Sequence, residues 1–503
     1  MFDDNHLISC LARHASTAPD APFARRADGQ PDVSYGALFG GAQRMAAALV
    51  AAGLSPGDRV AVQVEKSLQA LELYLGTVVA GGVFLPLNTG YTADEVAYFL
   101  TDATPSVVVC DPSRADDIAP LAGAAHLFTL DADGQGTLAQ ARPAPGTPFA
   151  ATPRGADDLA AILYTSGTTG RSKGAMLSHA NLASNSETLV DYWRFTPDDV
   201  LIHALPIFHT HGLFVATNVA LLSGASVVFL PRFDADAVLD AMPSATALMG
   251  VPTFYTRMLD NPRLTRDRAA NMRLFISGSA PMLRDTHEKW QARTGHTVLE
   301  RYGMTETNMN TSNPYEGERR AGTVGFPLPG VELRIVDADG TPVGRGEIGV
   351  IEVRGPNVFQ GYWQMPEKTA EELRPDGWFI TGDQATEDAD GYITIVGRAK
   401  DMVITGGFNV YPKEIESMID DIEGIAESAV IGVPHPDFGE AVIAVIVAEN
   451  RAMTEAEVMA EIGSRLARFK QPKTCIFVPE LPRNTMGKVQ KKALRETYQN
   501  LFS

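Results

Sequence analysis

Cysteine is scarce in this sequence. The 503 residues contain three cysteines, Cys10, Cys110 and Cys475, which are far apart and form no CxxC pair. This argues against a disulfide scaffold and against a structural zinc site, and it favours a reducing compartment. We therefore expect three free, buried thiols.

Positive charge is also in short supply. The chain has 42 Lys and Arg against 61 Asp and Glu, a net charge of −19 at pH 7. A nucleic acid phosphate backbone attracts a basic stripe, so we expect no nucleic acid partner. An acidic surface repels anionic substrates as well, and capture of such a substrate then requires a basic pocket inside the molecule.

Long uninterrupted apolar runs are absent. The two most apolar stretches, Leu68–Leu87 and Leu213–Leu230, are broken by Glu72, glycines and Asn218. They are typical of core helix-to-strand passages rather than of membrane spans. The first residues lack a basic segment followed by an apolar one, so we expect no secretory signal, no membrane partner and a cytoplasmic location.

The pattern of apolar residues predicts an α/β fold with more than one domain, since 503 residues exceed what one core usually supports. Short β-branched runs such as Arg59–Val64 and Val107–Val109 alternate with helical patterns such as Ala93–Asp102. A similar unit follows at Leu201–Ile276, and the two predict α/β subdomains with largely parallel sheets.

The pattern changes after Gly322. Strand pairs with Asp-Gly turns, among them Val331–Val336 and Gly349–Arg354, predict a small β-barrel or curled sheet. A mixed α and β segment then predicts a separate small α+β domain, with strands at Val430–Val433 and Ala441–Val447 and a helix at Glu455–Phe469. We expect an N-terminal domain over residues 1–398, a connection at 399–401 and a C-terminal domain over 402–503.

A loop rich in Gly, Ser and Thr follows the apolar strand predicted at Leu159–Tyr164. The segment Tyr164–Gly174 reads YTSGTTGRSKG and offers backbone N–H groups, hydroxyls and cations, a combination that binds polyphosphate. The Walker spacing G-x-x-x-x-G-K-[ST] is absent, which argues against a P-loop NTPase. A flexible Gly/Ser linker is the alternative explanation.

A second polar segment lies near the C-terminus. Pro482–Lys488 reads PRNTMGK and places Lys488 after a glycine, free to enter a cleft from another domain. Local sequence alone favours a solvated surface lysine beside Lys491 and Lys492, and it is the PRNTMGK context that favours a functional role for Lys488.

These two segments belong to a series that resembles the adenylate-forming superfamily of acyl-CoA synthetases, nonribosomal adenylation domains and luciferases. The motifs occur in that family's order and span most of the chain: YTSGTTGRSKG, Tyr302–Glu306 (YGMTE), Thr381–Asp383 (TGD), Gly397–Asp401 (GRAKD), Gly406–Pro412 (GGFNVYP) and Lys488. The resemblance implies an enzyme that activates a carboxylic acid with ATP and Mg²⁺ and transfers it to a thiol. We expect that thiol to be coenzyme A.

The resemblance also implies roles for individual residues in binding ATP. Ser166, Thr168, Thr169 and Lys173 would hold the β- and γ-phosphates, Thr305 would contact the α-phosphate and Glu306 would bind Mg²⁺. Tyr302 would lie against the adenine, while Asp383 would accept the ribose hydroxyls with support from Arg398. The remaining nucleotide-binding residues implied are Thr165, Gly167, Gly170, Ala280, Pro281, Gly303 and Met304.

Catalysis is expected to depend on Lys488, which would bridge the attacking carboxylate and the α-phosphate, together with Glu306, Thr305 and His209. In the family the small domain turns about a hinge between half-reactions, which here corresponds to Lys400 and Asp401. Gly406, Gly407 and Phe408 would then line the path of coenzyme A. An exposed Gly-Lys also suits a lysine acetyltransferase and deacetylase, and acetylation of Lys488 would remove its charge.

The identity of the acid depends on the residue before the YGMTE motif. Relatives that take apolar or aromatic acids have a small residue there, whereas this chain has Arg301. A guanidinium offers a bidentate contact to a second carboxylate, and the run ERYGMTET resembles that of malonyl-CoA synthetases. We therefore expect malonate, with methylmalonate as a second substrate. Ser279 and His209 would contact the distal carboxylate, and Thr210 and Met304 would set the room at C2.

Several alternatives stay open. Arg301 could pair with Glu300 or another acid, His209 could be a core histidine, and Arg284 and Arg232 are weaker candidates for the anion site. The enzyme could be a short-chain or aryl monocarboxylate-CoA ligase with Arg301 turned away, or an amino-acid adenylation enzyme, although no acidic residue for an amino group is identified. An inactive nucleotide-binding scaffold should show damage at key positions, but all four are intact: Lys173, Glu306, Asp383 and Lys488.

Overall fold

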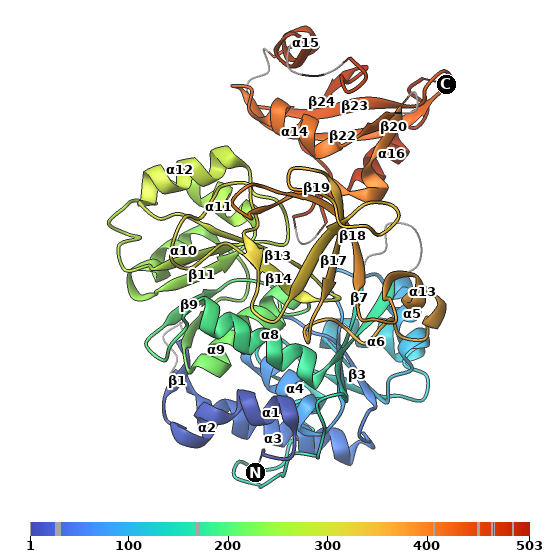
Figure 1. The fold of residues 1–503 in the computed structure, drawn as a ribbon. Helices are drawn as coiled ribbons and strands as arrows, with labels where there is room; N and C mark the ends of the chain where they lie inside the picture. The colour runs from blue at the N-terminus through green and yellow to red at the C-terminus, as the bar shows by residue number, and fades with distance from the viewer. Residues whose placement is uncertain are drawn as a thin grey trace.

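The structure, a computed structural model, describes residues 2–25, 32–165, 172–405, 408–449, 453–463, 466, 468–484 and 487–502. Figure 1 shows a large N-terminal part with the smaller C-terminal part above it. The N-terminal part begins with the helices α1 (His6–Leu11) and α2 (Arg13–Thr17), and α3 (Tyr35–Ala51) follows two short strands. None of the helices in the described residues is both long and apolar enough to cross a membrane.

A six-stranded sheet forms the first α/β unit, in the order β6-β5-β3-β4-β7-β8. Its strands are β3 (Arg59–Gln63), β4 (Val83–Pro86), β5 (Val107–Cys110), β6 (His126–Thr129), β7 (Leu159–Thr165) and β8 (Lys173–Ser178). The strands up to β7 pair in parallel and β8 returns antiparallel to β7. The accompanying helices are α4 (Leu68–Val79), α5 (Ala93–Ala103), α6 (Ala115–Ile118) and α7 (Thr137–Ala141). The Gly-rich loop thus connects the ends of β7 and β8.

A nine-stranded sheet forms the second unit, in the order β15-β14-β13-β12-β11-β9-β10-β1-β2. Its strands are β1 (Pro22–Arg25), β2 (Val33–Ser34), β9 (Val200–His203), β10 (Ser226–Phe229), β11 (Ala247–Gly250), β12 (Leu274–Ser277), β13 (Leu299–Met304), β14 (Asn308–Ser312) and β15 (Phe326–Pro327). Strands β9, β11, β12 and β13 are parallel neighbours, so their carboxyl ends meet at one edge. Ligands in α/β sheets bind at such an edge.

Helices connect the strands of this second sheet. They are α8 (His179–Tyr192), α9 (Asn218–Ser223), α10 (Ala235–Ala241), α11 (Pro252–Leu259) and α12 (Arg284–Thr294), together with a π-helical segment, η3 (His211–Thr217). π-Helical turns are rare and frequently occur at functional sites. The segment η3 follows directly after the His209–Thr210 pair.

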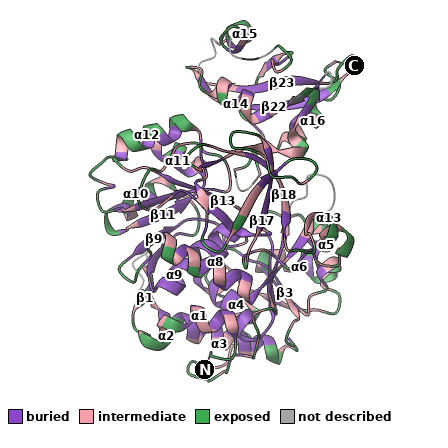
Figure 2. Ribbon diagram, viewed as in Figure 1, coloured by how far each residue is buried: buried purple, intermediate pink, exposed green. Residues whose placement is uncertain are grey.

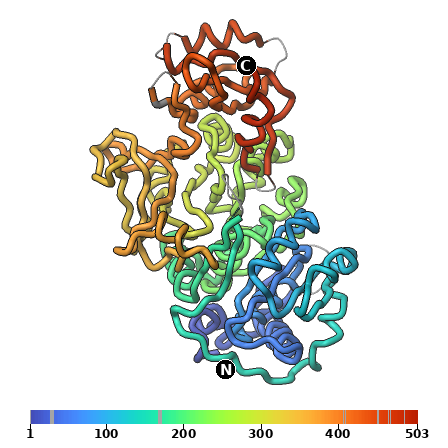
Figure 3. The backbone as a smooth tube through the Cα atoms, turned by 90° about the vertical axis from the view of Figure 1, so that its right-hand side faces the viewer, coloured from blue at the N-terminus to red at the C-terminus, as the bar shows by residue number. Residues whose placement is uncertain are grey.

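An antiparallel sheet of four strands forms the orange part at the left of Figure 3, beside the α/β units and below the C-terminal part. It runs in the order β16-β17-β18-β19, with β16 (Glu332–Val336), β17 (Gly349–Arg354), β18 (Phe379–Glu387) and β19 (Ile393–Arg398). It is an open sheet with β16 and β19 as edges. Helix α13 (Pro366–Glu372) lies in the connection between β17 and β18.

The C-terminal part contains a mixed sheet of β20 (Val403–Thr405), β21 (Phe408–Val410), β22 (Ile425–His435), β23 (Gly439–Ala448) and β24 (Cys475–Phe477). Its helices are α14 (Pro412–Asp420), α15 (Glu455–Gly463) and α16 (Lys491–Tyr498). Strands β22 and β23 extend the predicted Val430–Val433 and Ala441–Val447 at both ends. Of the helix predicted over Glu455–Phe469, the described residues Glu455–Gly463 form α15, whereas Leu466, Arg468 and Phe469 are not helical.

The hydrophobic core of the N-terminal part is separate from that of the C-terminal part. One large cluster runs from Phe2 to Ile393 in sequence, whereas two clusters from Val403 onward cover opposite faces of the C-terminal sheet. Figure 2 shows the same division as buried residues inside each part. Of the three free cysteines, Cys110 and Cys475 are buried as predicted, while Cys10 is only half-buried.

Candidate active site

Arg301 lies in β13 at the carboxyl edge of the nine-stranded sheet and is only 3% exposed. Its Nε and Nη2 atoms are buried and have no hydrogen-bond partner among the described residues. Burial lowers the pKa of Arg301 to about 9. A buried guanidinium with free donors is costly, because removal from water is not compensated by an anion.

Glu300 does not neutralise Arg301. Consecutive strand residues point to opposite faces, and the Glu300 carboxylate accepts the Gly322 N–H at 3.0 Å. Burial raises the pKa of Glu300 to about 8. The alternative in which Arg301 pairs with Glu300 is therefore wrong. Arg284 and Arg232 are exposed and lie outside this site.

Two histidines flank Arg301, one of which the sequence analysis did not single out. His211 is fully buried, its Nδ1 lies 3.2 Å from the Ser279 hydroxyl, and its Nε2 has no partner among the described residues. His209 is half-buried, and its Nδ1 accepts the His211 backbone N–H at 3.3 Å. Burial and the nearby cations Lys488 and Arg301 lower the pKa of His209 to about 3, so its imidazole is neutral.

Ser279 has a backbone φ of 69°, a left-handed conformation that is rare for a residue with a side chain. It follows β12 in the turn that also contains the half-buried Ala280 and the exposed Pro281. This backbone directs the Ser279 hydroxyl toward His211. Strain of this kind persists where the surrounding structure fixes it, most often at binding sites.

Thr210 and Met304 are the residues expected to set the room beside the acid. Thr210 is 2% exposed and its Oγ1 has no partner among the described residues. Met304 is half-buried at the end of β13, with its Sδ 3.9 Å from the Tyr302 hydroxyl. Gly303, the residue before Met304, lies so close to the Asn308 carbonyl oxygen that a Cβ atom would stand 1.9 Å from it. Only glycine fits at this hairpin.

Asp383 lies between Tyr302 and Arg398. The Tyr302 hydroxyl donates to Oδ2 at 2.6 Å, and Arg398 Nε lies 2.8 Å from Oδ1. Asp383 and Arg398 are cross-strand partners in β18 and β19, and Thr381 of the TGD motif accepts the Asp383 N–H at 3.1 Å. Of the three residues predicted around the nucleoside, Asp383 thus contacts both of the others. Burial and the Asp383 charge raise the pKa of Tyr302, which keeps its hydroxyl protonated.

Glu306 is buried at 5% exposure and accepts the Tyr362 hydroxyl at Oε1 over 2.9 Å. The same hydroxyl lies 2.6 Å from Oε2 of Glu372, which forms an ion pair with Lys173. Thr305 is half-buried in the turn before Glu306, and Thr165 pairs with Lys173 across the ends of β7 and β8. The part of the predicted loop formed by Ser166, Gly167, Thr168, Thr169 and Gly170 lies outside the described residues.

Lys488 reaches this site from the C-terminal part. Its backbone N–H donates to Asn484 Oδ1 at 2.9 Å, and the neighbouring Gly487 packs beside Thr253 of α11, 3.3 Å from where a Cβ would stand. The side chain keeps an exposed surface, yet the surrounding protein lowers the pKa of Lys488. The nearby cations Arg398 and Arg301 also lower the pKa of Lys488, whereas the carboxylates Asp383 and Glu306 raise it.

The connection between the two parts contains a short 3₁₀ turn, Ala399–Asp401. Arg495 of α16 donates to Asp401 at 2.6 Å. Lys400 is exposed, but the surrounding protein and the charge of Arg398 lower its pKa to about 8. Phe408, expected near coenzyme A, is 54% exposed and stacks on Phe469, whereas Gly406 and Gly407 lie outside the described residues.

Sequence reasoning missed three residues of the site: His211, Tyr362 and Glu372. His211 was visible in the FHTHG run beside His209, but nothing in the sequence indicated which imidazole faces Ser279. Tyr362 and Glu372 belong to a connection between strands and carry no motif. Among the described residues, no cluster of three or more His, Cys, Asp or Glu is arranged to hold a metal ion.

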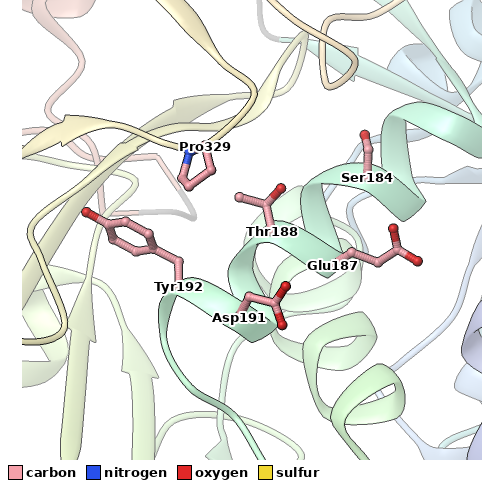
Figure 4. Close-up of a pocket in the computed structure, with 6 residues that line it drawn as sticks. All are labelled: Ser184, Glu187, Thr188, Asp191, Tyr192 and Pro329. Carbon is pink, nitrogen blue, oxygen red and sulfur yellow. The ribbon is translucent and has the colours of Figure 1, made fainter.

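A hollow of about 530 Å³ lies elsewhere, along the outer side of α8 (Figure 4). Its lining residues are Ser184, Glu187, Thr188, Asp191, Tyr192 and Pro329. The lining includes no cation and none of the predicted site residues. We therefore assign it no role in the chemistry.

Comparisons with known proteins identify similar chains. The crystal structure of ATP-bound MatB from Rhodopseudomonas palustris is 61% identical and covers 99% of this chain and 100% of its own, with a TM-score of 0.95. The apo MatB structure, with the same identity and coverage, has a TM-score of 0.85.

Among curated proteins, the malonate–CoA ligase of Arabidopsis thaliana is 33% identical over 99% of this chain and 91% of its own. The feruloyl-CoA synthase of an Amycolatopsis species is 37% identical over 98% of this chain and 99% of its own. Residues 11–363 match the family model of AMP-binding enzymes, and residues 414–488 match that of the AMP-binding enzyme C-terminal domain. The chain therefore belongs to the family of AMP-binding, adenylate-forming acyl-CoA ligases.

Proposed function

We propose that the protein is an AMP-forming malonate–CoA ligase. A malonate carboxylate attacks the α-phosphorus of ATP, giving malonyl adenylate and pyrophosphate. The coenzyme A thiol then attacks the acyl carbonyl, giving malonyl-CoA, AMP and a proton. The observation that carries this proposal is the buried Arg301 guanidinium, whose Nε and Nη2 have no partner among the described residues.

An arginine in this environment favours a substrate with a second carboxylate. The distal carboxylate of malonate supplies the missing counter-ion and accepts two N–H groups from the planar guanidinium. Ser279, His209 and His211 lie beside Arg301 as neutral hydrogen-bonding groups. If His211 accepts the Ser279 proton at Nδ1, its Nε2 carries the N–H that a carboxylate can accept.

Among the curated relatives, overall similarity alone does not distinguish the acids. The chain is as similar to a feruloyl-CoA synthase as to a plant malonate–CoA ligase, although an aromatic acid and a dicarboxylate need different pockets. The difference has to lie in the pocket. A buried cation disfavours a neutral aromatic ring there, which supports malonate over a monocarboxylate. Methylmalonate would add one methyl group beside Thr210 and Met304.

Adenylation places negative charge on both sides of the transferred phosphoryl group, and the residues around it supply the opposite charge. Asp383 would accept the ribose hydroxyls, and Lys173 with Ser166, Thr168 and Thr169 would hold the β- and γ-phosphates. Thr305 would contact the α-phosphate. Lys488 would bridge the attacking carboxylate and the α-phosphate, since its pKa already responds to groups at both ends of the site.

The residues present fit a magnesium ion. Glu306 offers a buried carboxylate held by the Tyr362 hydroxyl, and Mg²⁺ typically takes one or two carboxylates together with phosphate oxygens. Bound there, the ion would neutralise phosphate charge. Coenzyme A and the turn at Lys400 and Asp401 would serve the second half-reaction, with Gly406, Gly407 and Phe408 along its path. The exposed Lys488 is also open to an acetyltransferase and a deacetylase.

The test is AMP formation with coenzyme A across acetate, propionate, benzoate, ferulate, malonate, methylmalonate and succinate. We expect malonate, followed by methylmalonate, to give the highest kcat/KM. Preference for a monocarboxylate would remove the malonate assignment and leave the adenylating chemistry in place. Loss of AMP formation with every acid would favour a nucleotide-binding scaffold.

A further inference from the structure

Lys173, at the mouth of the Gly-rich loop, is held by a carboxylate that the proposed chemistry does not use. Its Nζ lies 3.1 Å from Oε1 and 3.0 Å from Oε2 of Glu372, 199 residues away in sequence. The Lys173 and Glu372 side chains are 18% and 23% exposed. Partial burial makes this contact stronger than a typical surface ion pair.

Further donors converge on the same carboxylate. The Tyr362 hydroxyl lies 2.6 Å from Oε2, and Lys368 Nζ lies 3.0 Å from Oε1. These contacts lower the pKa of Glu372 against the opposing effect of burial, so the group stays ionised. Two ammonium groups and a hydroxyl around one anion are a donor set that a phosphate oxygen also takes.

Helix stability does not explain Glu372. It is the last residue of α13, where the helix dipole disfavours a negative charge. Its pair with Lys368 also places lysine before glutamate, which is the weaker order for residues four apart. The charge at this position therefore serves a contact outside the helix, and the charged partner outside the helix is Lys173.

Glu372 is also coupled to Glu306. The Tyr362 hydroxyl lies 2.9 Å from Glu306 Oε1 and 2.6 Å from Glu372 Oε2, but a phenol has one proton and can donate to only one of them. Lys173 Nζ lies over the Tyr362 ring, 4.0 Å from its centroid. A change in the partner of Lys173 is thus transmitted through Tyr362 toward Glu306.

We propose that Glu372 is a positioning residue that competes with the polyphosphate for Lys173 and so weakens the hold on pyrophosphate. When a phosphate oxygen takes Lys173, the Lys173–Glu372 ion pair breaks, and it forms again as pyrophosphate leaves. No covalent bond changes in this exchange. The inference rests on the proposed function, in which Lys173 binds the β- and γ-phosphates.

The competition affects pyrophosphate more visibly than ATP. ATP keeps the contacts of its nucleoside with Asp383 and Tyr302, whereas pyrophosphate depends on the phosphate contacts alone. Removing the negative charge of Glu372 should therefore tighten pyrophosphate binding and slow its release. A purely structural role for Glu372 would predict the opposite sign, because loss of a structural contact weakens binding.

The test is the Kd of magnesium pyrophosphate, measured by titration calorimetry at fixed free Mg²⁺, for wild type and Glu372→Gln. We expect the variant to bind about threefold to tenfold more tightly, and its product-inhibition constant for pyrophosphate to fall by a similar factor. Glu371→Gln is the matched control. Glu371 is the adjacent residue, its side chain is 64% exposed, and it pairs with Lys368 rather than Lys173.

Unchanged or weaker pyrophosphate binding by a Glu372→Gln protein that melts like wild type would overturn the proposal. Weaker binding together with a raised Mg²⁺ requirement would do so as well, because it would identify Glu372 as a metal ligand. Glu372→Asp keeps the charge and should keep the wild-type Kd, so tighter binding there would also count against competition. The titration needs no carboxylic acid, and a wrong assignment of malonate leaves its result unaffected. Failure of wild type to bind either ATP or pyrophosphate would overturn both proposals.

Discussion

Gly278 lies against the guanidinium group of Arg301. A Cβ atom at position 278 would stand 2.5 Å from Cζ and 2.6 Å from both Nε and Nη1. No side chain fits there while Arg301 keeps its present position. Gly278 follows β12, whose neighbour β13 carries Arg301, so the two parallel strands together fix the space for the guanidinium.

Gly278→Ala should therefore displace the guanidinium and impair malonate turnover selectively. Loss of a charged hydrogen-bonded contact is worth about 1.5–3 kcal/mol, or roughly tenfold to a hundredfold in kcat/KM. Steady-state kinetics with malonate and propionate would measure this. Gly40→Ala is the control, because a Cβ at position 40 meets no atom within 4 Å. Equal losses with both acids would mean that Gly278 shapes the whole pocket.

Arg301→Ala should lose roughly 2–4 kcal/mol of transition-state stabilisation for malonate, because the distal carboxylate would be buried without a partner. Acetate turnover should change much less. The measurement is the ratio of kcat/KM values for the two acids. Arg284→Ala, which changes an exposed arginine, should leave that ratio unaltered. A uniform loss would assign Arg301 a structural role.

The preference for malonate should weaken in alkaline solution. Burial lowers the pKa of Arg301 to about 9, and only the protonated guanidinium attracts the distal carboxylate. The kcat/KM for malonate relative to propionate should thus fall as pH rises through about 9. Deprotonation of Lys488 affects both acids and cancels in this ratio. A ratio that stays flat from pH 7 to 10, or one that falls equally in Arg301→Ala, would contradict the assignment.

Lys488→Ala should separate the two half-reactions. Pyrophosphate release from ATP and malonate should be lost, because the bridging charge is gone, while supplied malonyl adenylate should still react with coenzyme A. Both steps can be followed separately by pyrophosphate and thioester assays. Lys492→Ala, at a lysine whose side chain is 65% exposed, is the control and should retain both steps. Loss of both steps in Lys488→Ala would contradict a role for Lys488 in adenylation alone.

Much of the fold was predictable because its elements follow local rules. The β-branched run at Arg59–Val64 became β3, and the Asp-Gly turns correctly indicated the antiparallel pairs β16 to β19. Sequence could not indicate that β1 pairs with β10, because that pairing joins residues about 200 positions apart through packing alone. The sequence also could not decide whether strands β16 to β19 form a barrel or an open sheet. That outcome depends on whether the two edge strands pair with each other.

The site was predictable where a motif carries it and unpredictable where only packing does. Tyr302, Asp383 and Arg398 were expected from three motifs, and both Tyr302 and Arg398 contact Asp383. The burial of Arg301 without a counter-ion depends on Glu300 facing the other way, which strand alternation alone suggests but does not establish. Glu372 meets Lys173 only because the connection that leads into α13 lies against β8, where Tyr362 bridges Ala175, and no local pattern in either segment indicates that contact.

The division of the hydrophobic core has a thermodynamic consequence. Alternate residues of β22 and β23 are covered on both faces by apolar groups from residue 403 onward, so the C-terminal part needs no apolar shelter from the rest of the chain. If the C-terminal part turns as proposed, both of these clusters would stay covered throughout the turn. The free-energy difference between orientations would then depend on polar contacts near the connection, such as the Arg495–Asp401 ion pair, and not on the apolar core that keeps this part folded.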